Sequence, residues 1–477
     1  MVYETVIGLE IHVQLSTKSK AFCADEVRFG AAPNTQVSAI SLGHPGTLPR
    51  LNRQQLDFAV RLGLALNSEI NLRNCFDRKN YFYADLPKGY QITQDNEPVC
   101  IGGSIPIQLG EEVKHIRIHH VHMEEDAGKS MHDSDDPHSY IDLNRAGTPL
   151  LEIVTEPDLR SAEEVDALMT AMRQLVRYLD ISDGNMQEGS MRCDCNVSIR
   201  PMGADYFGNR CEIKNLNSMR YARKAIAYEV ERQKKIVESG GTVAQQTLNF
   251  DPATGVTTPL RSKEDAHDYR YFPDPDLPPV VLSKQKVEEI RASLPALPWT
   301  IKEELKSKYQ LSAYNAELLS AEPEPAHFFL ALAQETSAYK AASNLVINKV
   351  MPWAKENEAS LADLPLTANS LAEFVELIEA GKVSNSVAYQ ELFPAMIAEP
   401  ETAPEKLATD NGWIQSDDAD ELGQWVDAAI AAFPDKVKAY QNGKKGLIGL
   451  FMGEVMKLSK GKADPKMANQ LLRERLV

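Results

Sequence analysis

Residues 6–15 read V-I-G-L-E-I-H-V-Q-L, and from residue 7 onward large apolar residues fill every second position. Because residues i and i+2 of a strand lie on one face, this period of two predicts a half-buried β-strand. Glu10 and His12 share its polar face, roughly 6.5–7 Å apart along the chain. An acid and an imidazole placed in this way could hold a hard metal ion, position a nucleophile or simply face water.

Two later segments repeat the pattern. Residues 191–200 read M-R-C-D-C-N-V-S-I-R, with Arg192 and Asp194 on the polar face and two cysteines on the apolar face. Residues 210–214 read R-C-E-I-K and place three charged side chains on one face. For each segment alone, the solvent-facing side of an antiparallel sheet is the more common explanation.

Helical periodicity appears at 53–66, 162–178 and 221–237. The second segment follows Ser161, a predicted N-cap with Glu164 in the capping-box position. Residues 271–279 read Y-F-P-D-P-D-L-P-P, and so many prolines predict a boundary.

Beyond that point the composition favours helices, with a second predicted boundary near 399–404. We therefore expect an α+β fold whose first domain contains an antiparallel sheet. The predicted domains are a catalytic body, a helical domain and a small basic helical tail, at 1–290, 291–405 and 406–477.

Composition indicates a soluble globular protein of several domains, with 477 residues and 43% hydrophobic residues. No apolar run approaches the roughly 18–20 residues that span a bilayer. The N-terminus resembles neither a secretory signal nor a transit peptide, and the six cysteines form no compact framework. We expect a cytoplasmic location, reduced thiols and no membrane partner.

The formal charge of −17 argues against nucleic acid, but it is unevenly distributed. Residues 436–477 hold ten lysines and arginines against three acids, a net charge of +7. Such a segment could contact a phosphate backbone, although solvated lysine-rich helices are common.

Residues 122–129 read H-M-E-E-D-A-G-K. Adjacent acids on a strand point to opposite faces, so only one of Glu124 and Glu125 can join a given site without a turn. Clustered carboxylates repel unless a cation neutralises them, and Mg²⁺ is a common solution. An acidic surface turn is the alternative. The irregular spacing of the six histidines between 115 and 138 disfavours a transition-metal site.

Residues 76–91 combine Arg78, Lys79 and Lys88 with three tyrosines. This patch could bind phosphates or stack an unpaired base, or its tyrosines could be half-buried strand residues. Residues 142–156 predict a turn followed by a strand that carries Glu152. The chain contains neither a P-loop motif nor a G-x-S-x-G nucleophile motif.

Several of these motifs together resemble the family of the B subunit of the aspartyl/glutamyl-tRNA(Asn/Gln) amidotransferase. They include I-G-L-E-I-H-V-Q-L, F-D-R-K-N-Y-F-Y, H-M-E-E-D-A-G-K, D-L-N-R-A-G-T-P-L-L-E-I-V-T-E-P-D, S-D-G-N-M-Q-E-G-S-M-R-C-D-C-N-V-S and D-Y-R-Y-F-P-D-P-D. They run in order from residue 6 to about residue 277, and the tail segment G-E-V-M-K-L-S-K-G-K-A-D-P resembles the family's C-terminal module.

The resemblance implies a cradle domain like the glutamine synthetase/guanido kinase fold, a helical tRNA-binding domain and a YqeY-like tail. It implies a heterotrimer in which two further subunits, a glutamine amidase and a small protein, join this chain. With ATP and Mg²⁺, this chain would phosphorylate the side-chain carboxyl of misacylated Glu-tRNA(Gln) or Asp-tRNA(Asn). Ammonia from the amidase would then displace phosphate to give the amide.

Carried over from the family, the magnesium ligands are His12, Glu125 and Glu152. We expect Glu10, Glu124 and Asp194 beside this site or at a second metal, in catalytic roles. The residues expected to contact ATP phosphates or the acyl group are Lys79, Lys88, Ser190 and Arg192.

Many relatives carry C-x-C and C-P-x-C motifs that resemble a four-cysteine zinc site. Here the corresponding residues are Cys23, Asp25, Ser38 and Ser41. Only one thiol remains, so we expect no zinc.

Two alternatives stay open beside the tRNA-dependent carboxyl kinase. A non-catalytic tRNA-binding scaffold would also have a basic tail, and its sheet face would merely be acidic. A free-standing carboxylate–amine ligase for a small acid is disfavoured by that basic tail.

Overall fold

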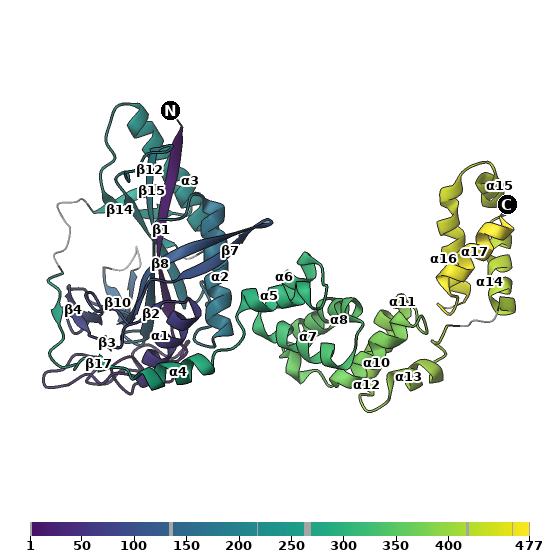
Figure 1. The fold of residues 1–477 in the computed structure, drawn as a ribbon, viewed down its shortest axis with the longest axis horizontal. Coiled ribbons are helices and arrows are strands. Elements are labelled where there is room, and N and C mark those ends of the chain that lie inside the picture. The colour runs from purple at the N-terminus through teal and green to yellow at the C-terminus, as the bar shows by residue number, and fades with distance from the viewer. Residues whose placement is uncertain are drawn as a thin grey trace. The chain divides into compact units, whose positions relative to one another are not determined.

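The computed structural model describes residues 2–132, 137–216, 218–261, 269–415, 419–459 and 461–476. It divides the chain into two compact units, Met1–Pro298 and Trp299–Val477. Figure 1 shows strands concentrated in the first unit and helices in the second. Lys460 of the basic tail and Asp268 of the D-Y-R-Y-F-P-D-P-D motif lie outside the described residues.

A ten-stranded sheet forms the body of the first unit, in the order β15-β14-β13-β12-β1-β11-β8-β6-β2 with β7 paired to β8. All described pairs are antiparallel except β13 with β14, so the sheet is mixed rather than purely antiparallel. Its strands are β1 Tyr3–Gln14, β2 Glu69–Ile70, β6 Cys100–Ile101, β7 Ser104–Leu109, β8 Glu112–Glu125, β11 Pro149–Thr155, β12 Met191–Pro201, β13 Cys211–Leu216, β14 Gln246–Asp251 and β15 Val256–Arg261.

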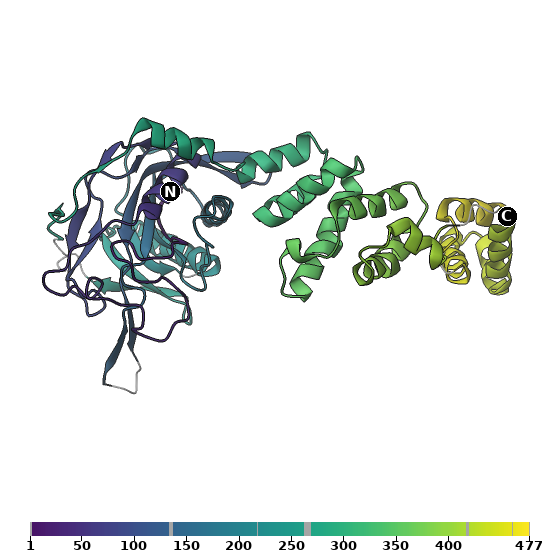
Figure 2. The same cartoon turned by 90° about the horizontal axis from the view of Figure 1, so that it is seen from below.

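Alternation along β1 places one set of side chains in the core. Ile7, Ile11 and Val13 are fully buried, as predicted. Cys193 and Cys195 on β12 are buried on the same apolar face, with reduced thiols. Helices α2 (Ala162–Tyr178) and α3 (Met219–Glu238) pack together, and α3 packs on β12, so they cover this face (Figures 1 and 2).

The predicted helices are present, with one change at a cap. Helix α1 spans Arg53–Ala65, and the Ser161 side chain accepts a hydrogen bond from Glu164 N at the start of α2. The Glu164 carboxylate, however, accepts from Arg160 N at 2.7 Å and from Lys114 Nζ at 2.8 Å. In a capping box this carboxylate would accept from the backbone N–H of the N-cap residue, Ser161; here it accepts from the residue before it.

The proline-rich segment 271–279 does not end the first unit. Phe272–Pro273 (β16) pairs with Asp77–Asn80 (β4), which pairs with Tyr90–Thr93 (β5), and Val280–Val281 (β17) pairs with Arg73–Asn74 (β3). Prolines are tolerated here because these are short edge strands. Strands β9 (Lys129–His132) and β10 (Ser139–Asp142) form a separate hairpin, and α4 spans Lys284–Ala292.

The second unit is helical. Two π-helical turns, η2 (Val346–Val350) and η4 (Ala388–Leu392), precede prolines 352 and 394. Widening the turn makes room where a proline ring would clash with the carbonyl four residues earlier. The other helices are α5 Pro298–Ser307, α6 Ala313–Ser320, α7 Pro323–Glu335, α8 Tyr339–Leu345, α9 Met351–Glu356, η3 Leu361–Asp363, α10 Ala368–Glu379, α11 Asn385–Val387, α12 Phe393–Ala398 and α13 Pro404–Asp410.

The tail helices enclose their own core, which includes Leu422, Phe451 and Leu472. Helix α13 packs against α10 and α12 instead, so it associates with the helices that precede the predicted boundary at 399–404. The tail helices are α14 Ala419–Ala431, α15 Pro434–Gln441, η5 Lys445–Leu447, α16 Ile448–Leu458 and α17 Pro465–Arg475. Among the described helices, none combines the length and the apolar character needed to cross a membrane.

Candidate active site

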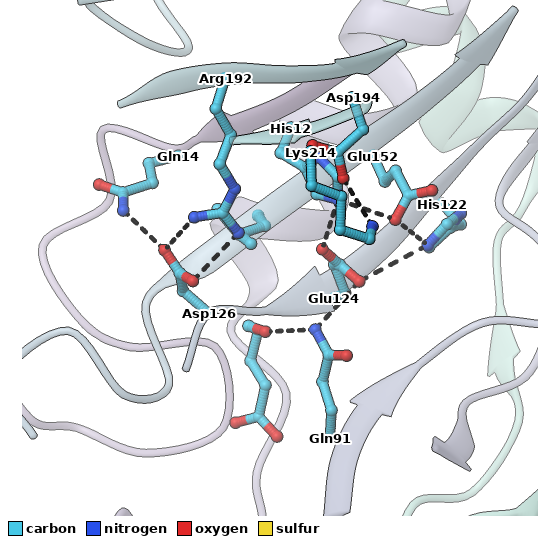
Figure 3. Close-up of polar contacts among 12 residues, drawn as sticks. His12, Gln14, Gln91, His122, Glu124, Asp126, Glu152, Arg192, Asp194 and Lys214 are labelled. Atoms are coloured by element: carbon cyan, nitrogen blue, oxygen red, sulfur yellow. Dashed lines mark hydrogen bonds and ion pairs between the residues drawn. The ribbon is translucent and has the colours of Figure 1, made fainter. Parts of the chain in front are cut away.

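A row of polar side chains crosses four neighbouring strands on the face opposite α2 and α3. The register places His12 on β1 directly across from Arg192 on β12 and from Glu152 on β11, and Glu152 across from His122 on β8. Directly opposed residues bring their Cβ atoms to about 4.5–5.5 Å. The strand pairing alone therefore gathers these side chains (Figure 3).

Two carboxylates and two imidazoles meet in this row. His12 Nε2 lies 3.2 Å from Glu152 Oε2 and 3.8 Å from Glu124 Oε1. His122 Nε2 lies 3.5 Å from Glu152 Oε2 and 3.7 Å from Glu124 Oε2. We call His12, Glu124 and Glu152 the first acid cluster; it offers ligand atoms that all lie within 4.8 Å of one another.

The charges of these groups depend on one another. Burial acts to raise the pKa of Glu152, but His122 and His12 outweigh it and hold that pKa well below its ordinary value. Burial acts to lower the pKa of His122, but the carboxylates of Glu152 and Glu124 raise it to about 10. Without a metal ion, protonated imidazole thus supplies the positive charge that the buried carboxylates require.

Neighbouring elements hold Glu124 in place. Gln91 on β5 donates from Nε2 to Glu124 Oε2 at 3.0 Å and to the Glu125 carbonyl at 2.7 Å. Gln55 on α1 donates to the Glu124 carbonyl at 2.8 Å. The small sheet β16-β4-β5 therefore faces the first acid cluster across from β8.

The donors suit a divalent cation. The buried Glu124, the half-buried Glu152 and one imidazole bring their ligand atoms together, and carboxylate oxygens are the ligands that Mg²⁺ prefers in proteins. His12 Nδ1 is buried and has no hydrogen-bond partner among the described residues, so Nε2 is the nitrogen that the acids hold.

Glu125 lies outside the first acid cluster, because adjacent residues of β8 point to opposite faces. Its carboxylate forms an ion pair with Lys88 and accepts a hydrogen bond from Ile92 N at 3.0 Å. Glu125 and Lys88 line a cavity of about 110 Å³ together with the fully buried Lys20. The ligand set that contains Glu125 in place of Glu124 stays a prediction.

A second group of acids occupies the next row of the same sheet face. Glu10, Asp194 and Glu212 also bring ligand atoms within 4.8 Å of one another, and we call them the second acid cluster. Lys214 Nζ lies 2.9 Å from Asp194 Oδ2 and 2.5 Å from Glu212 Oε1, and Asn196 donates to Glu10 at 3.0 Å. Burial, with the charges of Glu152 and Glu212, raises the pKa of Glu10.

The predicted phosphate and acyl contacts are spread around these clusters. Arg192 Nη2 lies 3.2 Å from Asp126 Oδ1, and Gln14 donates to the other Asp126 oxygen at 2.8 Å. Ser190 precedes β12, and its carbonyl accepts from Gln14 N at 2.8 Å. Lys79 lies on β4 directly across from Gln91, on the small sheet that faces Glu124.

The sequence alone does not predict several residues of this site. His122 opens the segment H-M-E-E-D-A-G-K, but the irregular spacing of the histidines argues only against a transition-metal site and gives His122 no other role. His122 and Glu124 are two residues apart on one strand, so their shared face is the signal that could have placed His122 beside Glu124. Lys20, Gln91 and Gln55 enter the site from other elements, and no local pattern marks them.

Asp25 connects the positions where a zinc site was considered. It accepts hydrogen bonds from Ser38 N at 2.8 Å and from the Ser41 hydroxyl. Burial acts to raise the pKa of Asp25, but these bonds and one from Cys23 lower it. One thiol, one carboxylate and two hydroxyls are a poor donor set for structural zinc. The absence of zinc stays a prediction.

Comparisons with known proteins agree on one family. The family model described as the GatB/GatE catalytic domain matches residues 5–288, and the one described as the GatB domain matches residues 327–476. Curated relatives, each named as the B subunit of aspartyl/glutamyl-tRNA(Asn/Gln) amidotransferase, match over 100% of both chains. They include proteins of Geotalea daltonii (48% identical), Bordetella petrii (48%) and Persephonella marina (44%).

Proposed function

Because this chain belongs to the family of the B subunit of the aspartyl/glutamyl-tRNA(Asn/Gln) amidotransferase, we propose that it activates the side-chain carboxyl of an acylated tRNA. A carboxylate oxygen of Glu-tRNA(Gln) or Asp-tRNA(Asn) attacks the γ-phosphorus of ATP, and ADP leaves. Ammonia then attacks the acyl carbon of the acyl phosphate, inorganic phosphate leaves, and the amide is formed.

The first acid cluster is the observation that carries this proposal. Phosphoryl transfer needs positioning and charge neutralisation more than covalent chemistry. Mg²⁺ bound by His12, Glu124 and Glu152 would neutralise charge on the transferring phosphoryl group. His122 and Gln91 hold the two carboxylates in position, and Lys79 adds positive charge from the facing sheet.

The relatives are named as one subunit of an enzyme, which supports further subunits for this chain. We propose that these are a glutamine amidase and a small third protein, and that the basic tail contacts tRNA. In this proposal the amidase supplies the ammonia. A non-catalytic scaffold would not need a buried and a half-buried carboxylate that converge on an imidazole.

Adjacent substitutions test the metal assignment within the reconstituted complex. We expect Glu124→Gln to reduce acyl-tRNA-dependent ATP hydrolysis on the order of a hundredfold or more, since a charge-stabilising group is lost. Glu125→Gln, whose carboxylate pairs with Lys88, should reduce this rate by less than about tenfold. Glu112→Gln, at the exposed start of β8, is the control.

The opposite ranking would favour the ligand set with Glu125. Full ATP hydrolysis and amide formation by both variants would contradict the carboxyl-kinase proposal and favour a scaffold. Glutamine hydrolysis by the amidase partner, measured in each sample, shows that the complex has assembled.

A further inference from the structure

Four tyrosines form a ladder beside the first acid cluster. The ring centroids of Tyr83 and Tyr81 are 5.8 Å apart, those of Tyr81 and Tyr269 are 6.0 Å apart, and those of Tyr269 and Tyr271 are 6.1 Å apart. Each pair meets edge to face, one of the geometries that aromatic side chains prefer. Tyr83 and Tyr271, at the two ends, are 57% and 38% exposed.

The ladder is assembled from two distant segments that are fixed to each other. Asn80 N donates to the Tyr269 carbonyl at 2.9 Å, and Asn80 Nδ2 donates to the Arg270 carbonyl at 2.9 Å. Arg78 forms 2.8 Å ion pairs with Asp274 and with Asp276. These contacts preorganise the tyrosine rings, so binding of a ligand there would cost little ordering entropy.

Lys79 connects the ladder to the first acid cluster. Its Nζ lies 4.8 Å from the ring centroid of Tyr269, a cation–π distance. Burial acts to lower the pKa of Lys79, but Tyr271, Glu124 and Glu152 outweigh it, so the pKa is raised and the ammonium is retained. A ligand on the ladder would therefore lie beside both a cation and the proposed metal donors.

We propose that the ladder of Tyr81, Tyr83, Tyr269 and Tyr271 stacks the unpaired terminal bases of the acylated RNA strand. Aromatic rings next to basic side chains are the platform that proteins use for single-stranded nucleic acid. Its two exposed ends favour a strand that passes over it rather than an enclosed mononucleotide. This inference rests on the proposed function, since it positions the acyl group at the first acid cluster.

Substitution of Tyr271 tests the ladder in the reconstituted complex. The probes are full-length deacylated tRNA, the same tRNA without its terminal nucleotide, and tRNA with fluorescent 2-aminopurine as the terminal base. We expect wild type to bind the full-length tRNA about tenfold more tightly than the shortened one, a typical stacking contribution. Tyr271→Ala should lose this preference and the quenching of 2-aminopurine.

Tyr271→Phe keeps the ring and should retain both properties. Tyr206→Ala removes a 58% exposed tyrosine between β12 and β13, away from both acid clusters and the ladder, and is the matched control. An undiminished preference for full-length tRNA in Tyr271→Ala would overturn the proposal. A rise in the KM for ATP with an unchanged KM for acylated tRNA would also overturn it, because the ladder would then hold adenine of ATP.

The proposed function can fail separately. If wild type shows no ATP hydrolysis that depends on acylated tRNA, the carboxyl-kinase proposal fails. If wild type hydrolyses ATP in this way while the Tyr271 variants do not differ, only the ladder proposal fails.

Discussion

The two acid clusters lie in adjacent rows of one sheet face, but different groups neutralise the negative charge of their carboxylates. The first cluster is balanced by the imidazoles of His12 and His122, which can lose a proton or turn a nitrogen lone pair to a metal. The second is balanced by Lys214, whose raised pKa keeps it a cation. An ammonium can donate hydrogen bonds but cannot act as a ligand. Strand register therefore gathers acids in both clusters. The group that neutralises them, imidazole or ammonium, decides which cluster can bind a divalent ion.

The largest expected difference between the two clusters is in the rate of ATP hydrolysis after the same Glu→Gln substitution in each. Glu152→Gln should lower ATP hydrolysis that depends on acylated tRNA on the order of a hundredfold or more. Glu212→Gln, in the second cluster, should lower it by no more than about tenfold. Initial rates over a range of Mg²⁺ concentrations measure both. Similar losses in the two variants would show that both clusters take part in the reaction.

Removal of Lys214 should convert the second cluster into a cation-requiring site. Lys214→Met leaves three acids without their cation, and we expect a loss of roughly 3 kcal/mol in the free energy of unfolding. Millimolar Mn²⁺ should recover part of that loss, which thermal unfolding with and without the ion would measure. Lys114→Met, at a similarly exposed ion pair with the single acid Glu164, is the control. An unchanged melting temperature would contradict the role given to Lys214.

The first cluster should respond to pH when divalent ions are absent. The pKa of His122 is raised to about 10, from an ordinary value of about 6.5. Its contribution to stability is therefore complete below about pH 6.5 and is lost as the pH rises toward about 10. Melting temperatures across this pH range should fall more in wild type than in His122→Gln. Added Mg²⁺ should reduce this fall; parallel curves for the two proteins would refute the assignment.

Glu10→Gln should have the smallest effect. The pKa of Glu10 is raised by burial and by nearby acids, so loss of its charge relieves repulsion, while the amide can still accept from Asn196. We expect the free energy of unfolding to change by less than about 1 kcal/mol. Chemical denaturation measures it, and a large loss would mean that the Glu10 charge is required for folding.

The sequence predicted the strands of the site well, because alternation is a local signal. The polar faces of β1 and β12 and the buried cysteines of β12 are all where parity placed them. Parity also implied that only one of Glu124 and Glu125 could join His12. It could not say which one, since that depends on the register between β8 and β11.

The remaining contributions are set by contacts over long sequence distances. Gln55 and Gln91 reach the site from α1 and β5, and Tyr269 returns to β4 through a segment whose prolines indicated a boundary. Local patterns mark turns and faces, but they do not reveal which distant strand a segment will join.

The position of β1 at the centre of the sheet has a consequence for how the protein is made. This strand is synthesised before the other strands of the sheet, and one of its two neighbours, β12, ends roughly 190 residues later. At about 5–20 residues per second, the ribosome needs roughly 10–40 s to deliver that neighbour. During this interval one edge of β1 lacks its permanent partner, which exposes that edge to aggregation and favours protection by chaperones. The same strand that carries His12 thus makes the nascent chain vulnerable until translation of β12 is complete.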